Sequence, residues 1–332
     1  MKNNRQFTKI LGVGAYVPEK VVTNDDLCKI VDTSDEWIQS RTGIRERRIA
    51  RADQTTSDLC VCAARRAMEN ANISVGDIDL ILTGTITSDT AFPSTSTFVQ
   101  KKLGVKDIPC IDYNVACSGL QYGLEIARSF IESQRYKKIL LICGDKLSAV
   151  TDWQDRSTCV LFGDGAGAIV LSATEKEEEN SIIDILLGAN GEHTEILMMP
   201  AGGSREPASE ESVKGRRHFL KMSGRDVFRE AVKIMGSCAQ EILDRNGMSA
   251  NDVDFVVTHQ ANWRIIDAIR ERLNVPSEKV CVTIDKYGNT SASSCIIAID
   301  SLIGSNKIVP GSKVLTVSFG AGLTWGAAIL KF

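Results

Sequence analysis

A cysteine at the start of a predicted helix is the first residue of this chain that suggests covalent chemistry. Cys117 follows the strand-like run "IDYNVA" and precedes an apolar helical pattern set by Leu120, Leu124, Ala127 and Ile131. Aligned peptide dipoles at a helix N-terminus favour an anion, so this position is expected to lower the thiol pKa below its free value of ~8.5. From the position alone, a buried structural cysteine is the favoured interpretation.

A histidine and an asparagine are predicted to lie near that cysteine. His259 ends the apolar strand in "VVTHQANW". A histidine at a strand end can be catalytic or purely structural. Asn289 lies in "IDKYGNTSASSC", whose Ile284 pairs with Ile111 at an offset of 284 − 111 = 173. If the two halves of the chain are related, Cys117 and Asn289 both stand at helix N-termini and His259 reaches the same pocket. Cysteine with histidine and a polar third group is the pattern of an activated nucleophile.

The other nine cysteines carry no comparable signal. They form no C-x₂-C pair and no ligand spacing with the three histidines, so no metal site is predicted. Cys60 and Cys62 lie in a helical stretch, where their thiols point in different directions. We expect small buried hydrophobic roles for most of this set, which comprises Cys28, Cys60, Cys62, Cys110, Cys143, Cys159, Cys238, Cys281 and Cys295.

Two glycine-rich stretches resemble nucleotide-binding loops but lack the required context. A dinucleotide loop needs a strand, a glycine turn and then a helix whose N-terminus faces the pyrophosphate. In "FGDGAGAIVL" (162–171) the glycines run into a strand, and in "GVGAYVPEK" Pro18 prevents the following helix. Close packing and sharp turns are the preferred interpretation of these glycines.

The chain repeats itself at a nearly constant offset. "NISVGDIDLIL" from Asn72 matches "GMSANDVDFVV" from Gly247, and 247 − 72 = 175. "KKILLICGD" from Lys137 matches "SKVLTVSFG" from Ser312, again at 175. We predict two similar halves, residues 1–174 and 175–332, with the acidic run 174–181 at their boundary.

Continuous apolar strands alternate with helices in both halves, which predicts sheets covered on both faces. The expected fold is α/β in an α-β-α-β-α layered arrangement, with a pseudo-twofold axis between the halves. Residues 201–219 are polar and contain Gly and Pro, so they predict an exposed loop that is either functional or mobile.

Composition limits the function classes. The 332 residues are 43% hydrophobic and 24% charged with a net charge of −3, which excludes a generally basic, nucleic-acid-coating protein. No apolar run reaches the ~18 residues of a membrane helix, and "MKNNRQFTKI" lacks the apolar region of a signal peptide. We therefore expect a cytosolic protein without nucleic-acid or membrane partners.

Several segments together resemble the thiolase-fold condensing enzymes, and specifically the β-ketoacyl-[acyl-carrier-protein] synthase III family. They include "ACSG", "THQAN", "YGNTSA" and the C-terminal "SFGAGLTWGAAILKF", with "DEWIQSRTGIRERRIA" and "AFPSTS" nearer the N-terminus. The resemblance spans essentially the whole chain. Cys–His–Asn indicates the synthase III and chalcone synthase branch, and the short length with "TGIRER" favours synthase III.

The resemblance implies a two-stage reaction that starts fatty-acid synthesis. Cys117 takes the acyl group of an acyl-CoA, with acetyl-CoA as the expected primer, and malonyl-acyl-carrier protein then loses CO₂ and condenses with it. His259 and Asn289 would donate hydrogen bonds to the enolate oxygen. CoA enters as a substrate, and no permanently bound cofactor is implied.

The family also implies a second oxyanion site, made by the backbone N–H groups of Cys117 and Ala321. The family commonly has glycine at the position of Ala321. A Cβ there would cost roughly 1–2 kcal/mol if the turn required a positive φ.

Further roles carried over from the family concern CoA, the carrier protein and the dimer. Trp37 would stack on adenine, Arg41 and Arg156 would lie near the nucleotide, and Asn262 and Arg264 would line the pantetheine tunnel. Phe92 would reach the partner's pocket across a homodimer interface. The basic landing site for the acidic carrier protein would comprise Arg229, Arg264, Arg270 and Arg272. Without the family match, Trp37 could equally be an apolar residue that anchors its helix. The arginines could equally be solvated surface charges.

Two other functions remain open from the sequence. One is a synthase III-like enzyme of specialised metabolism that uses a branched, longer or aromatic primer, because primer choice depends on pocket volume. The other is a non-catalytic partner subunit of the same fold. Such subunits usually lose the nucleophile, and this chain retains Cys117, His259 and Asn289.

Overall fold

The computed structural model describes residues 5–332, so the first four residues of the N-terminal stretch considered above lie outside it. Its larger sheet has the strand order β1-β7-β6-β4-β5. The bounds of these strands are Phe7–Tyr16 (β1), Gly165–Thr174 (β7), Lys138–Asp145 (β6), Leu80–Gly84 (β4) and Cys110–Tyr113 (β5).

The second main sheet has the order β11-β12-β13-β8. Its strands are Phe255–Thr258 (β11), Lys313–Gly320 (β12), Thr324–Lys331 (β13) and Ile182–Ala189 (β8). β11 runs parallel to β12, as β4 does to β5 and β6, whereas β1 and β8 pair with antiparallel neighbours. Both sheets are therefore mixed.

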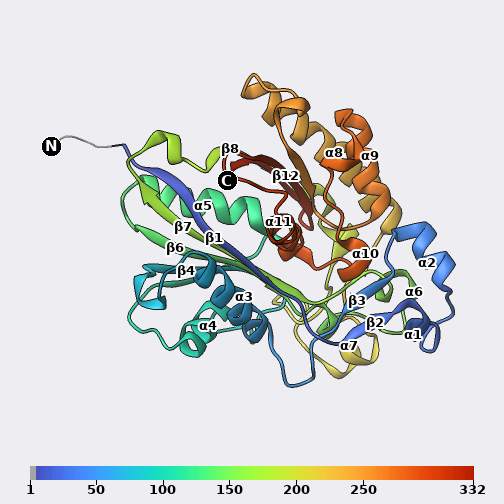
Figure 1. The fold of residues 1–332 in the computed structure, drawn as a ribbon. Helices are drawn as coiled ribbons and strands as arrows, with labels where there is room; N and C mark the ends of the chain where they lie inside the picture. The colour runs from blue at the N-terminus through green and yellow to red at the C-terminus, as the bar shows by residue number, and fades with distance from the viewer. Residues whose placement is uncertain (1–4) are drawn as a thin grey trace.

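Helices cover both faces of each sheet and one helical layer lies between the sheets (Figure 1). The middle layer consists of α5 (Gly119–Glu132) and α11 (Ser294–Gly304). The outer helices are α3 (Thr56–Asn70) and α4 (Thr95–Leu103) on one side, and α8 (Gly224–Arg245) and α9 (Trp263–Leu273) on the other. The predicted α-β-α-β-α arrangement is confirmed.

Side chains alternate between the two faces of a strand, which explains why each sheet is covered by helices on both faces. In β6, Ile139, Leu141 and Cys143 face the middle helices, whereas Leu140 and Ile142 face α3. All five are fully buried. A strand with apolar side chains on both faces is stable only between two packed layers.

The two halves fold into corresponding elements at the offset found in the sequence. The starts of β1 and β8 differ by 182 − 7 = 175, those of β4 and β11 by 255 − 80 = 175, and those of β6 and β12 by 313 − 138 = 175. The middle helices α5 and α11 also start 294 − 119 = 175 residues apart. The sheets and the central helices thus repeat closely.

One sequence pairing is wrong in register. The run containing Ile284 was expected to match the strand at Ile111, but it forms the short helix α10 (Ile284–Tyr287). At the offset of 175, Asn289 corresponds to Asn114, and the residue opposite Cys117 is Ala292. A connection of the same length can be strand or helix, because packing overrides the weak local preference of a four-residue segment.

Short elements surround the ends of the central helices. They are the β2–β3 hairpin strands (Val21–Thr23 and Glu46–Arg48), α1 (Asn24–Cys28), α2 (Asp35–Thr42), α6 (Arg156–Cys159), α7 (Glu210–Lys214) and the paired β9 (Leu197–Met198) and β10 (Lys221–Met222). The predicted exposed loop 201–219 contains α7. None of the helices within residues 5–332 combines the length and apolar character needed to span a bilayer.

The starts of α5 and α11 lie so close that one of the two helices needs a glycine at the contact. A Cβ on Gly119 would lie 2.7 Å from the Cβ of Ala292. Real Cβ atoms do not approach that closely, so the contact fixes glycine on α5 and a small residue opposite it. This crossing determines where both helices begin.

We predict that Gly119→Ala destabilises the fold by about 1–3 kcal/mol, the usual penalty for overpacking a core. Urea unfolding followed by circular dichroism measures the change. Adding Ala292→Gly should recover most of the loss, because it removes the methyl group that the new side chain meets. A double variant as unstable as Gly119→Ala would contradict this explanation.

Candidate active site

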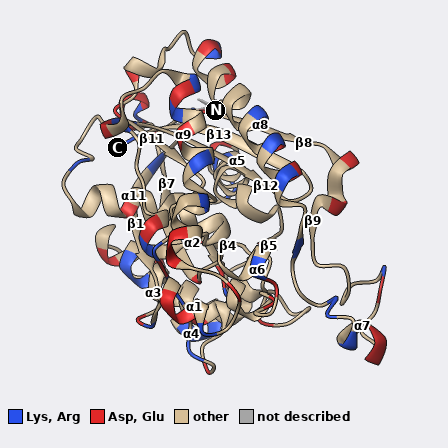
Figure 2. Cartoon of the chain, turned by 90° about the vertical axis from the view of Figure 1, so that its right-hand side faces the viewer, with Lys and Arg blue, Asp and Glu red and all other residues tan. Residues whose placement is uncertain are grey.

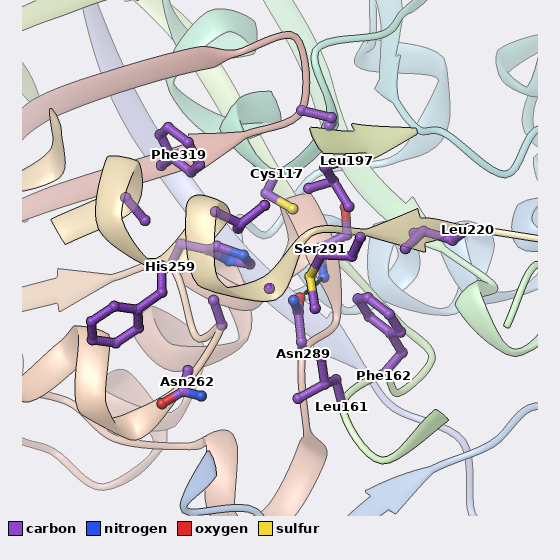
Figure 3. Close-up of a pocket in the computed structure, with 18 of the residues that line it drawn as sticks. Cys117, Leu161, Phe162, Leu197, Leu220, His259, Asn262, Asn289, Ser291 and Phe319 are labelled. Carbon is purple, nitrogen blue, oxygen red and sulfur yellow. Dashed lines mark hydrogen bonds between the residues drawn. The ribbon is translucent and has the colours of Figure 1, made fainter. Parts of the chain in front are cut away.

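A cavity of about 1020 Å³ brings the predicted triad together. Cys117 comes from the turn before α5, His259 from the end of β11, and Asn289 from the segment between α10 and α11. Figure 3 shows the three side chains pointing toward a common space from different elements. His259 and Asn289 are 2% and 8% exposed, so any group held between them is almost free of water.

The backbone around Cys117 is held in an unusual conformation. Ala116 has a φ of 48°, in the left-handed region that costs a non-glycine residue roughly 1 kcal/mol or more. The end of β12 packs directly against this turn, since a Cβ on Gly320 would lie 2.7 Å from the Cys117 backbone nitrogen. Thr324 Oγ1 donates to the Val115 carbonyl at 2.9 Å. The second sheet therefore sets the position of Cys117.

The surroundings of Cys117 disfavour its thiolate form. Burial raises its pKa to about 12, although hydrogen bonding by Ser291 lowers it. The expectation that the helix N-terminus would lower this pKa is therefore wrong in direction. Exclusion of water by the surrounding core penalises a thiolate more than the helix end favours it.

His259 is a neutral hydrogen-bond donor. Its Nδ1 lies 2.7 Å from Ser294 Oγ, and the same hydroxyl oxygen accepts the backbone N–H of Gln260 at 3.2 Å. The hydroxyl proton of Ser294 is then available to Nδ1, which leaves the ring proton on Nε2. Burial lowers the imidazole pKa to about 4, so the ring stays uncharged at neutral pH.

Asn289 presents its amide nitrogen in the same way. Its Oδ1 accepts the backbone N–H of Ser291 at 2.9 Å, and its own backbone bonds with Leu161 and Gly163. With the oxygen occupied, the Nδ2 hydrogens are left for a ligand. His259 and Asn289 together can donate two hydrogen bonds to one oxygen atom that gains negative charge.

Ala321 fits the turn without strain. It lines the cavity next to Gly322, and the positive φ in this turn, 133°, belongs to Gly322. Among residues 5–332, the non-glycine residues with a positive φ do not include Ala321. The Cβ at a position where the family commonly has glycine therefore carries no left-handed backbone penalty.

Four of the five residues predicted to contact CoA line the same cavity as the predicted triad. Trp37, Arg41, Asn262 and Arg264 all line it. Arg156 lies outside the lining, and its guanidinium stacks on the Trp37 ring at 4.5 Å from the centroid. Asn262 also has structural contacts, because its Oδ1 caps α9 and its Nδ2 donates to the Arg41 carbonyl.

The predicted carrier-protein arginines lie on the neighbouring helices α8 and α9, and Figure 2 shows basic residues along α8. Arg229 pairs with Asp226 and Glu230, and Arg270 with Asp267 and Glu271. Arg272 bonds with Lys233 O and Ser237 Oγ, whereas Arg264 stacks on Phe228. Much of the charge of this patch is balanced locally.

Two other predicted features are located by the structure. Phe92 is 86% exposed, which is unusual for a large apolar side chain. Residues 201–219 are anchored by an ion pair between Arg216 and the buried Asp152. Asp152 also pairs with Lys221, which follows this segment. The glycines of "FGDGAGAIVL" lead into β7, so the predicted strand after these glycines is confirmed.

Sequence reasoning missed three buried polar residues at this site: Asp145, Ser291 and Ser294. Ser291 and Ser294 belong to a run of small polar residues just before an apolar helix. Asp145 ends a strand whose partner in the other half ends at Gly320, again 320 − 145 = 175 residues later. The repeat held a usable signal, since at the offset of 175 Asp145 corresponds to Gly320 at the end of β12, and Ser291 to Ala116 in the turn that carries Cys117.

Comparison with known proteins decides the family. Residues 111–191 match 3-oxoacyl-[acyl-carrier-protein] synthase III, and residues 243–332 match the C-terminal region of the same synthase. The chain is 50% identical over 323 residues to β-ketoacyl-[acyl-carrier-protein] synthase III of Caldanaerobacter subterraneus, covering 97% of each chain. The chain belongs to the β-ketoacyl-[acyl-carrier-protein] synthase III family. It is therefore an acyltransferase, a condensing enzyme that initiates fatty-acid synthesis.

Further relatives extend the same result. The synthase III of Xanthomonas campestris pv. campestris is 46% identical over 330 residues, covering 99% of this chain and 100% of its own. The crystal structure of the Aquifex aeolicus synthase III superposes with a TM-score of 0.89 at 44% identity, covering 98% of this chain and 100% of that one. The thiolase-like fold of this synthase III thus agrees with its solved relatives.

We predict that alkylation of Cys117 by iodoacetamide becomes about tenfold faster per pH unit between pH 6 and pH 9. The thiol pKa of about 12 leaves it protonated over this range, so each unit raises the thiolate fraction in proportion. Peptide mass spectrometry at matched times gives the rate, with Cys117→Ala as the control. A rate that levels off below pH 8 would mean that the thiolate is already formed.

Proposed function

We propose that this enzyme transfers the acyl group of an acyl-CoA to Cys117 and then condenses it with malonyl-acyl-carrier protein. Decarboxylation of the malonyl group would supply the carbon nucleophile, and the products would be 3-oxoacyl-acyl-carrier protein, CoA and CO₂. The observation that carries the proposal is the single cavity in which a thiol faces two neutral hydrogen-bond donors. A cytosolic location remains a prediction.

The proposed roles follow from the chemistry of each group. Cys117 holds the acyl group as a thioester, which is activated toward carbon nucleophiles. His259 and Asn289 stabilise the enolate oxygen formed when malonyl loses CO₂, because both keep an N–H free in a site with little water. The backbone N–H groups of Cys117 and Ala321 would bind the thioester oxygen during acyl transfer.

The shape of the cavity supports a short primer such as acetyl. Bulky apolar side chains line the cavity that contains the thiol, including Leu147, Phe162, Leu197, Leu220 and Phe319. CoA would extend toward Trp37 and Arg41, with Arg156 beside the Trp37 ring and Asn262 and Arg264 along the way. Adenine would have to displace Arg156 or use the other face of Trp37.

The proposed partners are the carrier protein and a second copy of the chain. Arg229, Arg264, Arg270 and Arg272 would contact the acidic carrier protein, with Arg264 closest to the cavity because it also lines it. Phe92 would be covered in a homodimer, and its 86% exposure supports an interface at that position.

Intact mass after incubation with a panel of acyl-CoA esters tests the proposal and the primer together. We expect a mass increase of one acyl group, fastest with acetyl-CoA, and none in Cys117→Ala. Labelling that persists in Cys117→Ala would refute the nucleophile. Preference for branched, longer or aromatic esters would favour the specialised enzyme, and no labelling by any ester would favour a non-catalytic subunit.

Separate changes at His259 and Asn289 test the second stage. We expect His259→Ala and Asn289→Ala to slow malonyl decarboxylation and condensation by about 10²–10³, while acylation of Cys117 partly survives. His218→Ala is a matched control, because its ring bonds with Ser212 and does not line the cavity. Normal condensation in both site variants would refute these roles.

A further inference from the structure

One cluster of apolar side chains lies entirely on the wall of the active-site cavity. Leu147, Phe162 and Leu220 form its buried centre, and its partly buried members, which include Leu197 and Met222, line the cavity as well. If the enzyme acts as proposed above, the primer is the apolar end of an acyl-CoA, and this wall is the surface that would bind it. The length of the primer then depends on what holds the wall in place.

Leu220 and Met222 reach this wall from the stretch that follows the polar segment 201–219. Successive side chains of an extended chain face opposite sides. Leu220 and Met222 line the cavity, whereas the Nζ of Lys221 between them lies 3.1 Å from Asp152 Oδ2. The strand β10 has two residues, and it pairs with the equally short β9. Because a two-residue pairing gives little stability, the position of this stretch depends on its other contacts.

Asp152 is a buried carboxylate that binds two cations of this stretch. Its side chain is 4% exposed, whereas those of Arg216 and Lys221 are 38% and 39% exposed. Arg216 Nε donates to the two carboxylate oxygens at 3.2 Å and 3.0 Å, and Arg216 Nη2 also donates to Oδ1. Hydrogen bonding by Arg216 holds the pKa of the Asp152 carboxyl below its usual value, so this group is charged at neutral pH. One carboxylate therefore holds the chain on both sides of Leu220.

Asp152 itself belongs to a well-anchored connection between β6 and α6. In this connection, the backbone N–H and Oγ of Ser148 donate to the carboxylate of the fully buried Asp164 at 2.8 Å and 2.6 Å. The backbone N–H of Gln154 donates to Asp152 Oδ1 at 3.1 Å. The connection is therefore attached to the core by buried hydrogen bonds, and it holds the Asp152 carboxylate in one orientation.

The segment that carries Arg216 has weaker anchors of its own. Val213, the apolar residue of α7, is 63% exposed, so α7 contributes little apolar packing. Arg216 has a φ of 54°, a left-handed conformation that a non-glycine residue keeps only where its surroundings favour it. A backbone bond of 2.9 Å, from the Leu220 N–H to the Val150 carbonyl, joins the segment to the connection that carries Asp152. The ion pairs therefore supply much of what keeps the segment in place.

We propose that Asp152 is a positioning residue that limits the length of the acyl primer. Its ion pairs with Arg216 and Lys221 hold Leu220 and Met222 on the apolar wall of the cavity. When these ion pairs are lost, the stretch moves outward and the cavity accepts longer acyl chains. Asp152 does not itself line the cavity, so it acts on the primer through Leu220 and Met222.

Single-turnover acylation of the full-length enzyme, measured by quenched intact mass with acetyl-CoA and hexanoyl-CoA, tests this role. Asp152→Asn and Arg216→Gln should each raise the ratio of the hexanoyl rate to the acetyl rate about tenfold, the lower end of what a pocket discriminates per methylene. The acetyl rate itself should change little. The double variant should raise the ratio no further than the single variants, because both changes remove the same contact.

Three further variants separate positioning from general stability. Arg217→Gln is the matched control, because this neighbouring arginine pairs with Glu206 of the same segment. It should keep the wild-type ratio even if it lowers the thermal stability. Arg216→Lys retains the positive charge and should keep most of the wild-type selectivity. In a Leu220→Ala background, Asp152→Asn should change the ratio less than it does in the wild type, because Leu220 transmits much of the effect.

The outcomes distinguish this positioning role from the proposed function. Acylation of the wild type supports the function whatever the variants do. An unchanged ratio in Asp152→Asn and Arg216→Gln would overturn the positioning role, and so would an equal rise in Arg217→Gln. If Asp152→Asn does not fold, Arg216→Gln decides the question by the same ratio, because the Arg216 side chain is partly exposed.

Limited digestion with a glutamyl endopeptidase tests the anchoring without any acyl-CoA. Cleavage after Glu210 or Glu211 should be faster in Asp152→Asn and Arg216→Gln than in the wild type and Arg217→Gln, because the freed segment opens more often. Equal cleavage rates in all four proteins would overturn the anchoring by Asp152. This result stands even if no ester acylates the wild type, an outcome that would refute the proposed function.

Discussion

The close crossing of two helix starts fixes the centre of this structure, and both sheets are packed around it. Gly119 and Ala292 meet where α5 and α11 begin, so the turns before these helices are forced together. One turn carries Cys117 and the other carries Ser291. Because each turn is also packed by a strand end from the opposite half, neither can move without disturbing a sheet. Core packing therefore positions Cys117, and no flexible loop is needed for it.

The same packing sets the electrostatics of the site. Burial raises the thiol pKa of Cys117 to about 12 and lowers the imidazole pKa of His259 to about 4, so both are neutral at rest. A neutral imidazole whose Nδ1 is occupied donates to a developing oxyanion without first losing a charge. The burial that keeps His259 neutral also disfavours the thiolate form of Cys117. In a site with little water, the hydrogen-bond partners of each polar group thus decide whether it can still donate or accept.

Much of this protein could be predicted because its local patterns agree with its overall fold. Apolar strands, helical spacing after Leu120 and the offset of 175 residues all indicate layered sheets, and the family resemblance supplied Cys117, His259 and Asn289. The register error at Ile284 has a simple cause, since a four-residue segment has too little local preference to resist its surroundings. The expected low thiol pKa failed because a helix end acts locally, whereas desolvation depends on every layer packed around the sulfur.

The element order, the two related halves and the family can all be inferred from the amino-acid sequence, because periodicity and motifs are properties of neighbouring residues. The pairing of the polar groups is visible only in the folded chain. Ser294 Oγ hydrogen-bonds with His259 Nδ1, and Asn289 Oδ1 accepts the backbone N–H of Ser291. One side-chain oxygen of Asp145 is buried without a hydrogen-bond partner. Hydrogen-bond partners and the exclusion of water arise between residues far apart in the chain. No local pattern records these pairings, because they exist only once the two halves have packed together.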